Sequence, residues 1–154
     1  MLEVNQTAPA FSAVNQDEKT ITLDQFQGKQ NVVLYFYPKD DTPGCTKESI
    51  AFTGLADAFE AAGAKVFGIS KDTVAKHDKF RDKHDLGVPL LSDAEGDVCE
   101  RYGVWKEKKM YGKTFMGIER TTVLIGGDGK IAQIWPKVKV DGHAEAVLEA
   151  VKAL

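Results

Sequence analysis

The chain has 154 residues, of which 43% are hydrophobic and 28% charged, and its formal net charge is −3. This length is enough to bury one hydrophobic core without a metal or disulfide, so we expect a single domain over residues 1–154. Lysines and arginines are interspersed among the acids, which argues against a nucleic-acid-binding stripe or a polybasic membrane segment.

The N-terminal segment carries no secretion signal. Residues 1–6 have no basic start and no apolar run, and no stretch approaches the roughly 18 apolar residues of a membrane span. We therefore expect a cytoplasmic protein without membrane contact. Two cysteines without a secretion signal argue against a disulfide framework, and the cysteines and histidines lack zinc-site spacing, so we expect no metal or other cofactor.

The first strong strand signal is the stretch 32–37. Its sequence, Val-Val-Leu-Tyr-Phe-Tyr, is apolar without polar alternation, which is typical of a central strand covered on both faces. Pro38 ends it, because proline has no N–H for a ladder. Before it, the residues from Phe11 begin the apolar pattern, 20–23 predicts a short strand, and 24–26 predicts a turn of helix.

Thr42 and Pro43 predict the start of a helix. A threonine hydroxyl at the N-cap can accept hydrogen bonds from free backbone N–H groups, and proline at the first position has its φ already set. Apolar residues spaced to share one face extend this prediction as a single long helix to residue 59, with Gly63 as the C-cap: Phe52, Leu55, Ala56 and Phe59.

Cys45, at the third helical position, is the candidate nucleophile. A sulfur there lies among unpaired N–H groups at the positive end of the helix dipole, which favours the thiolate over the thiol. Gly44 has no side chain, which lets a small substrate come close. The alternative is an inert cysteine beside a capping turn, in a binding module.

Strands and helices alternate after this helix. Residues 65–70 predict a second buried strand and 73–84 a charged amphipathic helix with Val74 and Phe80 inward. His77 is a candidate to join them, although the preferred interpretation of His77 and His84 is a helix-surface position without a catalytic role. The alternation is the signature of a parallel βαβ arrangement.

Residues 88–102 predict an extended piece over 88–91 and a short helix over 93–102. Val98 and Tyr102 are spaced to face inward, with Cys99 beside them. We interpret Cys99 as a small packing residue. The alternative is a disulfide with Cys45, which requires helix unwinding if the Cα atoms lie more than about 7 Å apart.

The last third of the chain predicts a polar, basic, exposed loop over 106–116, then a hairpin and a closing helix. The hairpin joins strands 121–125 and 130–135 through a glycine-rich turn, and the helix begins near Asp141 with its apolar residues on one face. Arg120, at the start of the first strand, is rigid enough for an anion clamp; the alternative is a solvated surface arginine.

Pro38, Thr42 and Cys45 fit the pattern Pro-x-x-x-Thr-x-x-Cys, and the surrounding segment resembles the peroxidatic loop of peroxiredoxins. The resemblance is closest to the bacterioferritin comigratory protein (PrxQ) branch and extends over nearly the whole chain, through the segments 8–11, 91–93, 102–105 and 117–122. It implies an α/β, thioredoxin-like fold with a central mixed β-sheet flanked by helices.

The resemblance also implies roles for site residues. A thiolate at Cys45 would attack hydrogen peroxide or a small organic hydroperoxide and become a sulfenic acid. Thr42 would hydrogen-bond the peroxide, Pro38 would shield the thiolate from water, and Arg120 would polarise the substrate and hold the sulfur anionic. Glu48 would orient Arg120 or is a solvated helix residue. Members of this branch are often monomers.

One departure from the family pattern concerns the second cysteine. Many members carry it five residues after the first, where this chain has Ile50, and others on the helix that corresponds to 73–84, which has none. We therefore expect a single-cysteine cycle regenerated by an external thiol such as thioredoxin, glutaredoxin or glutathione. The alternatives are a two-cysteine cycle resolved by Cys99 and a non-catalytic thioredoxin-like binding module.

Two other enzyme classes fit less well. A dithiol oxidoreductase needs Cys-x-x-Cys, but residue 48 is Glu. A phosphatase-type loop needs an arginine six residues after the cysteine, where this chain has Ala51.

Overall fold

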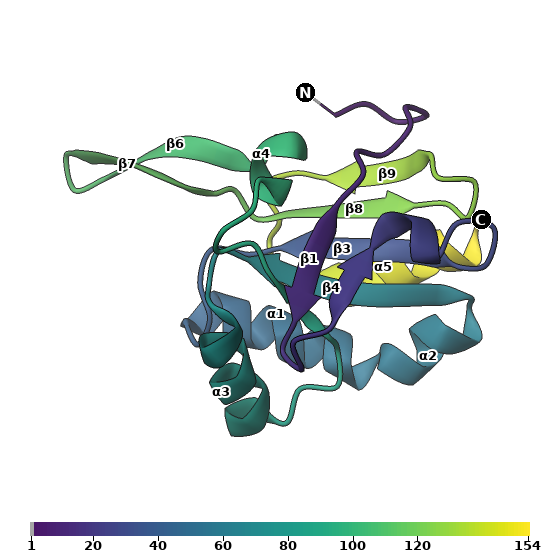
Figure 1. Cartoon of the computed structure of the whole chain (residues 1–154), viewed down its shortest axis with the longest axis horizontal. Coiled ribbons are helices and arrows are strands. Elements are labelled where there is room, and N and C mark those ends of the chain that lie inside the picture. Colours follow the sequence, from purple (N-terminus) through teal and green to yellow (C-terminus); the bar gives the residue numbers. More distant parts are fainter. Residues whose placement is uncertain (1) are drawn as a thin grey trace.

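A computed structural model describes residues 2–154 and has a seven-stranded mixed sheet at its centre (Figure 1). The strand order is β2-β1-β5-β4-β3-β8-β9, and the central β3 is parallel to β4 and antiparallel to β8. The strands are β1 (Ser12–Asn15), β2 (Thr20–Thr22), β3 (Asn31–Phe36), β4 (Ala64–Ser70), β5 (Leu90–Ser92), β8 (Thr121–Ile125) and β9 (Ile131–Trp135). The predicted α/β class with a mixed sheet is confirmed.

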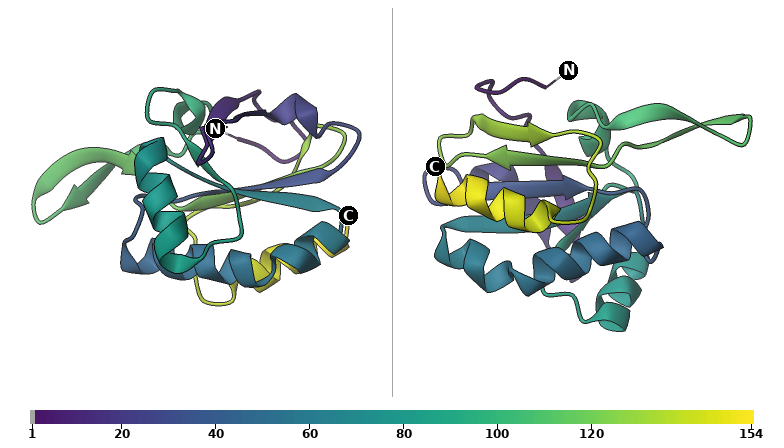
Figure 2. Two further views of the ribbon diagram at one scale, coloured as in Figure 1. Left: turned by 60° about the horizontal axis from the view of Figure 1, so that its bottom comes forward. Right: turned by 180° about the vertical axis from the view of Figure 1, so that it is seen from behind.

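Helices cover both faces of this sheet. Figure 2 shows α1, α2 and α5 together under one face, while α4 and the N-terminal segment with η1 lie over the other. The helices are η1 (Leu23–Gln25), α1 (Pro43–Gly54), α2 (Ala56–Ala61), α3 (Val74–His84), α4 (Val98–Arg101) and α5 (His143–Lys152). Within residues 2–154, no helix has the length and apolar character needed to cross a membrane.

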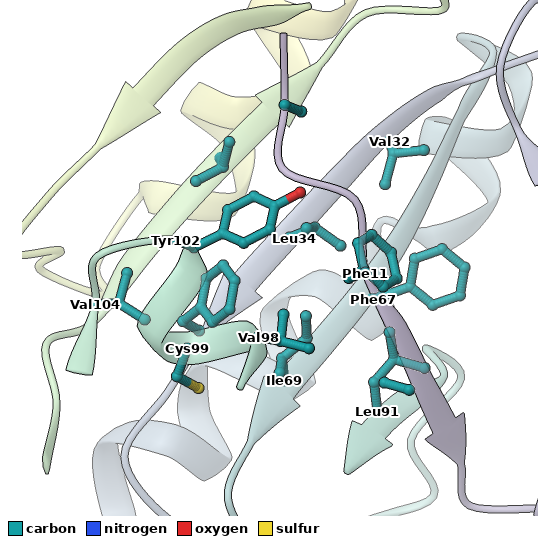
Figure 3. Close-up of a cluster of buried hydrophobic side chains, with 14 of the residues drawn as sticks. Phe11, Val32, Leu34, Phe67, Ile69, Leu91, Val98, Cys99, Tyr102 and Val104 are labelled. Carbon is teal, nitrogen blue, oxygen red and sulfur yellow. The ribbon is translucent and has the colours of Figure 1, made fainter. Parts of the chain in front are cut away.

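The sheet separates two hydrophobic cores, because side chains alternate along each strand. Val33 and Tyr35 of β3 pack into one core with Cys45 and the aromatic residues of α1 to α3. Leu34 of β3 packs into the other core, where Figure 3 shows Cys99 together with side chains from the N-terminal segment and α4. The two cysteines therefore belong to opposite sides of the sheet.

Two predicted helices are shorter than expected. The helix after Cys45 ends at Gly54 and restarts as α2, because Leu55 leaves helical geometry with φ −108° and ψ 7°. The helix predicted over 93–102 is only α4, because the Asp93 carboxylate accepts hydrogen bonds from the N–H groups of Val98 and Cys99 and holds the preceding residues as a turn.

The predicted loop over 106–116 is wrong. These residues form an antiparallel hairpin of β6 (Trp105–Met110) and β7 (Lys113–Ile118). Tyr111 and Gly112 join the strands with φ values of 52° and 74°, which is the geometry of a two-residue turn that follows the twist of the strands. Lysines on both faces conceal the strand pattern in the sequence.

Candidate active site

The site forms where β3 ends beside the start of β8. Phe36 pairs with Thr121 across these antiparallel strands, so Arg120 arrives next to the loop that follows β3. That loop leads into α1, with Thr42 at the N-cap and Cys45 in the first turn, as predicted. The backbone N–H of Val138 donates a 2.9 Å hydrogen bond to the Arg120 carbonyl and fixes the backbone there.

Arg120 links Cys45 to Glu48. Its Nη2 donates to Sγ of Cys45 at 3.3 Å, and its Nη1 donates to Oε1 of Glu48 at 2.7 Å. Cys45 is fully buried and Glu48 is 1% exposed, so both contacts lie in a poorly solvated environment. The three residues that the family resemblance assigns to one site are therefore in contact as one cluster.

Burial and the neighbouring charges shift the pKa values of Glu48 and Arg120. Burial raises the pKa of Glu48 to about 7, although the neighbouring Arg120 guanidinium acts in the opposite direction. The negative groups beside Arg120 raise its pKa further despite its burial, so it stays a cation. The second carboxylate oxygen of Glu48 is buried without a hydrogen-bond partner.

Thr42 and Pro38 lie in the loop between β3 and α1. The Thr42 hydroxyl donates to the Lys39 carbonyl at 2.9 Å and makes no capping hydrogen bond, so the predicted side-chain cap is wrong. The Thr42 carbonyl instead accepts the first helical N–H, from Thr46. Pro38 lies exposed between β3 and this loop.

The loop 38–42 is anchored to α3 by a buried pair that the sequence analysis missed. Nδ1 of His77 lies 2.6 Å from Asp40 Oδ2, and the Tyr37 hydroxyl donates to the other Asp40 oxygen at 2.6 Å. His77 Nε2 donates to the Leu91 carbonyl at 3.0 Å. The surface position preferred for His77 is therefore wrong: its side chain is fully buried. The signal for it was the inward spacing shared with Phe80.

Asp40, Asp72 and His77 are also the candidate metal ligands of the described chain. One ligand atom from each lies within 4.8 Å of the others. Each of these residues already has protein partners, however, since an Asp72 oxygen accepts from the Asp40 N–H at 2.8 Å and from the Ser70 hydroxyl at 2.6 Å. The cluster is best explained as a set of hydrogen bonds that holds the loop 38–42 in place.

His143 lies on the same side of the sheet and was also missed. Its Nε2 is 2.8 Å from the Thr122 hydroxyl, and its ring makes edge contacts with Phe52 and Trp135. Burial lowers the pKa of His143 to about 4, and the nearby Arg120 charge lowers it as well. The ring is therefore neutral at physiological pH.

Cys99 has surroundings unlike those of Cys45. Its side chain is fully buried in the opposite core, and burial raises the pKa of its thiol, with the Asp93 carboxylate adding to the effect. Both cysteines are free thiols. Because the sheet lies between the two cores, the two cysteines cannot approach to the roughly 7 Å between Cα atoms that a disulfide tolerates unless the structure around one of them unfolds.

The arrangement around Cys45 suits nucleophilic sulfur chemistry. A thiolate there faces a guanidinium and the free N–H groups of a helix N-terminus, which stabilise negative charge on sulfur or on an oxygen bound beside it. The Thr42 hydroxyl, at the N-cap of the same helix, keeps lone pairs that can accept further hydrogen bonds.

Comparisons with known proteins agree with this chemistry. Residues 4–134 match the model of the AhpC/TSA family. The chain is 52% identical over 122 residues to Peroxiredoxin Bcp of Xanthomonas campestris, covering 79% of this chain and 76% of that protein.

Solved structures give the same picture. A cysteine-to-serine mutant of PrxQ from Xylella fastidiosa superposes with a TM-score of 0.93 at 39% identity, covering 99% of this chain and 97% of that chain. The Bacterioferritin Comigratory Protein of Xanthomonas campestris, solved in a study of its alkyl peroxide reduction activity, has a TM-score of 0.87 at 45% identity, covering 93% and 90%.

Proposed function

This chain belongs to the AhpC/TSA family, in the bacterioferritin comigratory protein (PrxQ) branch of the peroxiredoxins, and we propose that Cys45 is the sulfur with which this thiol peroxidase attacks hydroperoxides. The observation that carries the proposal is the placement of the Arg120 guanidinium, 3.3 Å from Sγ of Cys45 and 2.7 Å from Glu48. A guanidinium in contact with sulfur favours the thiolate, which is the nucleophile.

In the proposed reaction, the thiolate attacks one oxygen of hydrogen peroxide or a small organic hydroperoxide. An S–O bond forms and the O–O bond breaks, and its electron pair leaves with the other oxygen, which takes a proton to give water or an alcohol. Cys45 becomes a sulfenic acid. Arg120 meets the charge that develops on the leaving oxygen.

The neighbouring residues have supporting roles in this proposal. The Thr42 hydroxyl, whose proton is engaged by the Lys39 carbonyl, accepts a hydrogen bond from the peroxide through its lone pairs. Pro38 shields the sulfur side of the loop from water. Glu48 holds Arg120 by Nη1, which keeps Nη2 directed at the sulfur and at a peroxide bound beside it. Because Cys45 is fully buried, a neighbouring side chain has to move before peroxide enters.

We propose that an external thiol such as thioredoxin, glutaredoxin or glutathione regenerates Cys45. The position of Cys99 in the core across the sheet and the raised pKa of its thiol both support this single-cysteine cycle over resolution by Cys99. The cytoplasm, where such thiols are abundant, is the proposed compartment, and the proposed assembly is a monomer.

Mass spectrometry after one equivalent of hydrogen peroxide, without reductant, tests the proposal. We expect the wild-type protein to gain one oxygen, trapped as a sulfenic acid on Cys45, and the Cys45→Ser variant to gain none. The matched variant Cys99→Ser should behave as the wild type and should turn over with an external thiol. Loss of two hydrogens with a Cys45 to Cys99 crosslink would contradict the single-cysteine cycle.

A further inference from the structure

The β6–β7 hairpin stands away from the body of the molecule. Figures 1 and 2 show it projecting beyond the ends of the sheet strands in every view. Over residues 2–154 its two strands pair with each other through six residues each and with no other strand. At about 3.3 Å per residue, the ribbon is roughly 20 Å long.

Only the base of the hairpin packs into a hydrophobic core. Ile118 is buried in the core that holds Cys99, and Trp105 packs against it. The hairpin carries four large exposed apolar side chains: Met110 (57%), Tyr111 (96%), Phe115 (43%) and Met116 (50%). By the strand register, Met110 and Phe115 lie on one face and Met116 on the other, with Tyr111 in the turn. Exposed apolar side chains gathered on one projecting element mark it as an interaction surface.

The same hairpin is the most basic segment of an acidic chain. It carries Lys106, Lys108, Lys109 and Lys113 against the single acid Glu107, although the whole chain has a net charge of −3. Lys106 is paired with Glu119 at 3.0 Å, but Lys109 and Lys113 are exposed near the tip. An acidic surface therefore complements this hairpin.

The base of the hairpin leads directly into the active site, because β7 ends at Ile118, two residues before Arg120. Lys108 shares a face with Phe115 and Gly117, and the missing side chain of Gly117 leaves room for it, since a Cβ there would lie 3.2 Å from Cδ of Lys108. Burial and the positive charge of Arg120 lower the pKa of Lys108. The ribbon thus runs from the edge of the Cys45 site out to an apolar, cationic tip.

We propose that residues 105–118 are the docking arm for the reductant, and that this reductant is a protein with an acidic surface and a reactive dithiol. This inference rests on the proposed external-thiol cycle. A small hydroperoxide fits beside one sulfur and does not need a 20 Å ribbon, whereas the reductant must place its own sulfur at Cys45. Apolar contacts at the tip and lysine contacts along the strands would hold such a partner across the site.

The docked step is a balanced thiol exchange. One partner thiol attacks the Cys45 sulfenic acid, an S–S bond replaces the S–O bond, and water leaves. The second partner thiol then attacks its neighbour in this mixed disulfide, which releases Cys45 as a thiol and leaves the partner as a disulfide. The two electrons come from the partner dithiol.

The experiment compares three assays on hairpin variants. A purified thioredoxin of low isoelectric point, recycled by its reductase and NADPH, is the protein probe, and dithiothreitol is the small dithiol. Single-turnover reaction with hydrogen peroxide reports Cys45 alone. The variants are Tyr111→Ser with Met116→Ser, which removes apolar contact, and Lys109→Glu with Lys113→Glu, which reverses charge. Val4→Ser with Leu154→Ser, two other exposed apolar residues, is the matched control.

We expect each hairpin variant to raise the KM for thioredoxin about tenfold, with the dithiothreitol and peroxide rates unchanged and the control equal to the wild type. The charge variant should also lose most of the salt dependence of the thioredoxin reaction. An unchanged KM overturns the inference, as does a wild type that dithiothreitol reduces and thioredoxin does not.

Two other occupants of the hairpin are tested by the same proteins. Sedimentation with anionic lipid vesicles, or a dimer in solution that the double variant Tyr111→Ser with Met116→Ser disrupts, together with an unchanged KM, would assign the hairpin to a membrane or a second copy and overturn the inference. A wild type that neither dithiol reduces contradicts the external-thiol cycle itself, and so is distinguishable from failure of docking alone.

Discussion

The position of the Arg120 guanidinium depends on Gly44, which has no side chain. A Cβ added to Gly44 would lie 3.2 Å from Nη2 of Arg120, closer than such contacts normally are. Arg120 has little freedom to retreat, because Nη1 is bound to Glu48 and its carbonyl to the Val138 N–H. The missing side chain of Gly44 therefore makes room for the guanidinium as well as for the substrate.

We predict that Gly44→Ala slows the reaction of Cys45 with hydrogen peroxide about tenfold, because a displacement of Arg120 of even a fraction of an ångström weakens its contact with sulfur. Stability should stay equal or rise slightly, since alanine is a better helix former than glycine by about 1 kcal/mol. Stopped-flow fluorescence and thermal unfolding measure the two. Gly54→Ala, in the same helix with open space around it, is the control and should keep the wild-type rate.

Glu48 illustrates a site residue that reduces stability. Its pKa is raised from 4.5 to about 7 by burial, so the folded protein binds this proton more tightly than the unfolded chain does. The stability that the protonated group contributes is present below pH 4.5 and is lost as the pH rises to about 7. This shift corresponds to about 3 kcal/mol.

We predict that Glu48→Gln gains stability relative to the wild type between pH 5 and pH 8, by up to about 3 kcal/mol, while its reaction with peroxide slows because Arg120 loses its charged anchor. Urea unfolding at the two pH values measures the first effect and single-turnover kinetics the second. Parallel stability profiles for the two proteins would show that Glu48 does not titrate in this range.

At the scale of elements, α3 fastens the loop that precedes Cys45. Two histidines of this helix each contact an aspartate of the loop: His77 with Asp40 in the interior at 2.6 Å, and His84 with Asp41 near the surface at 2.8 Å. The pairs have the same chemistry and differ in burial. Comparing the two pairs therefore measures how much burial adds to the unfolding free energy that such a pair contributes.

We predict that His77→Ala costs about 3 kcal/mol of unfolding free energy or more, because it leaves Asp40 buried with an unpaired oxygen. His84→Ala should cost less than about 1 kcal/mol, as exposed pairs do. Chemical denaturation compares the two. His77→Ala should also slow the peroxide reaction, since Asp40 holds the loop that carries Thr42. Equal costs for both variants would mean that the buried contact has no special part in fastening the loop.

The elements also show where sequence patterns are sufficient. β3, the start of α1 and α5 follow from apolar periodicity, proline and capping residues, which act over a few positions. The β6–β7 hairpin does not, because its strands depend on each other and carry lysines on both faces. The turn gives little local signal either, because only Gly112 suits the positive φ that both turn residues adopt, and Tyr111 does not.

At the scale of the whole molecule, the site depends on topology that no local pattern contains. The motif around Cys45 identifies the nucleophile, but the nearness of Arg120 requires β8 to lie antiparallel beside β3 in the register that pairs Phe36 with Thr121. The separation of Cys45 from Cys99 likewise requires the sheet between them. The resemblance to a family supplied the placement of Arg120 beside Cys45, whereas the position of Cys99 across the sheet was not predicted.

His143 connects α5 to the strands and α1, so its protonation acts on the whole fold. Its pKa is lowered from 6.5 to about 4, first by burial and then by Arg120, so the unfolded chain binds this proton more tightly than the folded protein does. The stability contributed by the neutral ring is present above pH 6.5 and is lost as the pH falls to about 4. Glu48 acts in the opposite sense over an overlapping range, so the two effects partly cancel in the wild type.

We predict that His143→Gln, which retains a polar group opposite the Thr122 hydroxyl, loses less stability than the wild type on acidification from pH 6.5 to 4, by about 3 kcal/mol. Urea unfolding at several pH values compares the wild type, His143→Gln, Glu48→Gln and the double variant. Because one pKa is raised and the other lowered, the double variant should keep an acid profile close to that of the wild type, while each single variant tilts the profile in its own direction. Single variants that tilt the profile in the same direction would contradict the opposing protonation assigned to the two groups.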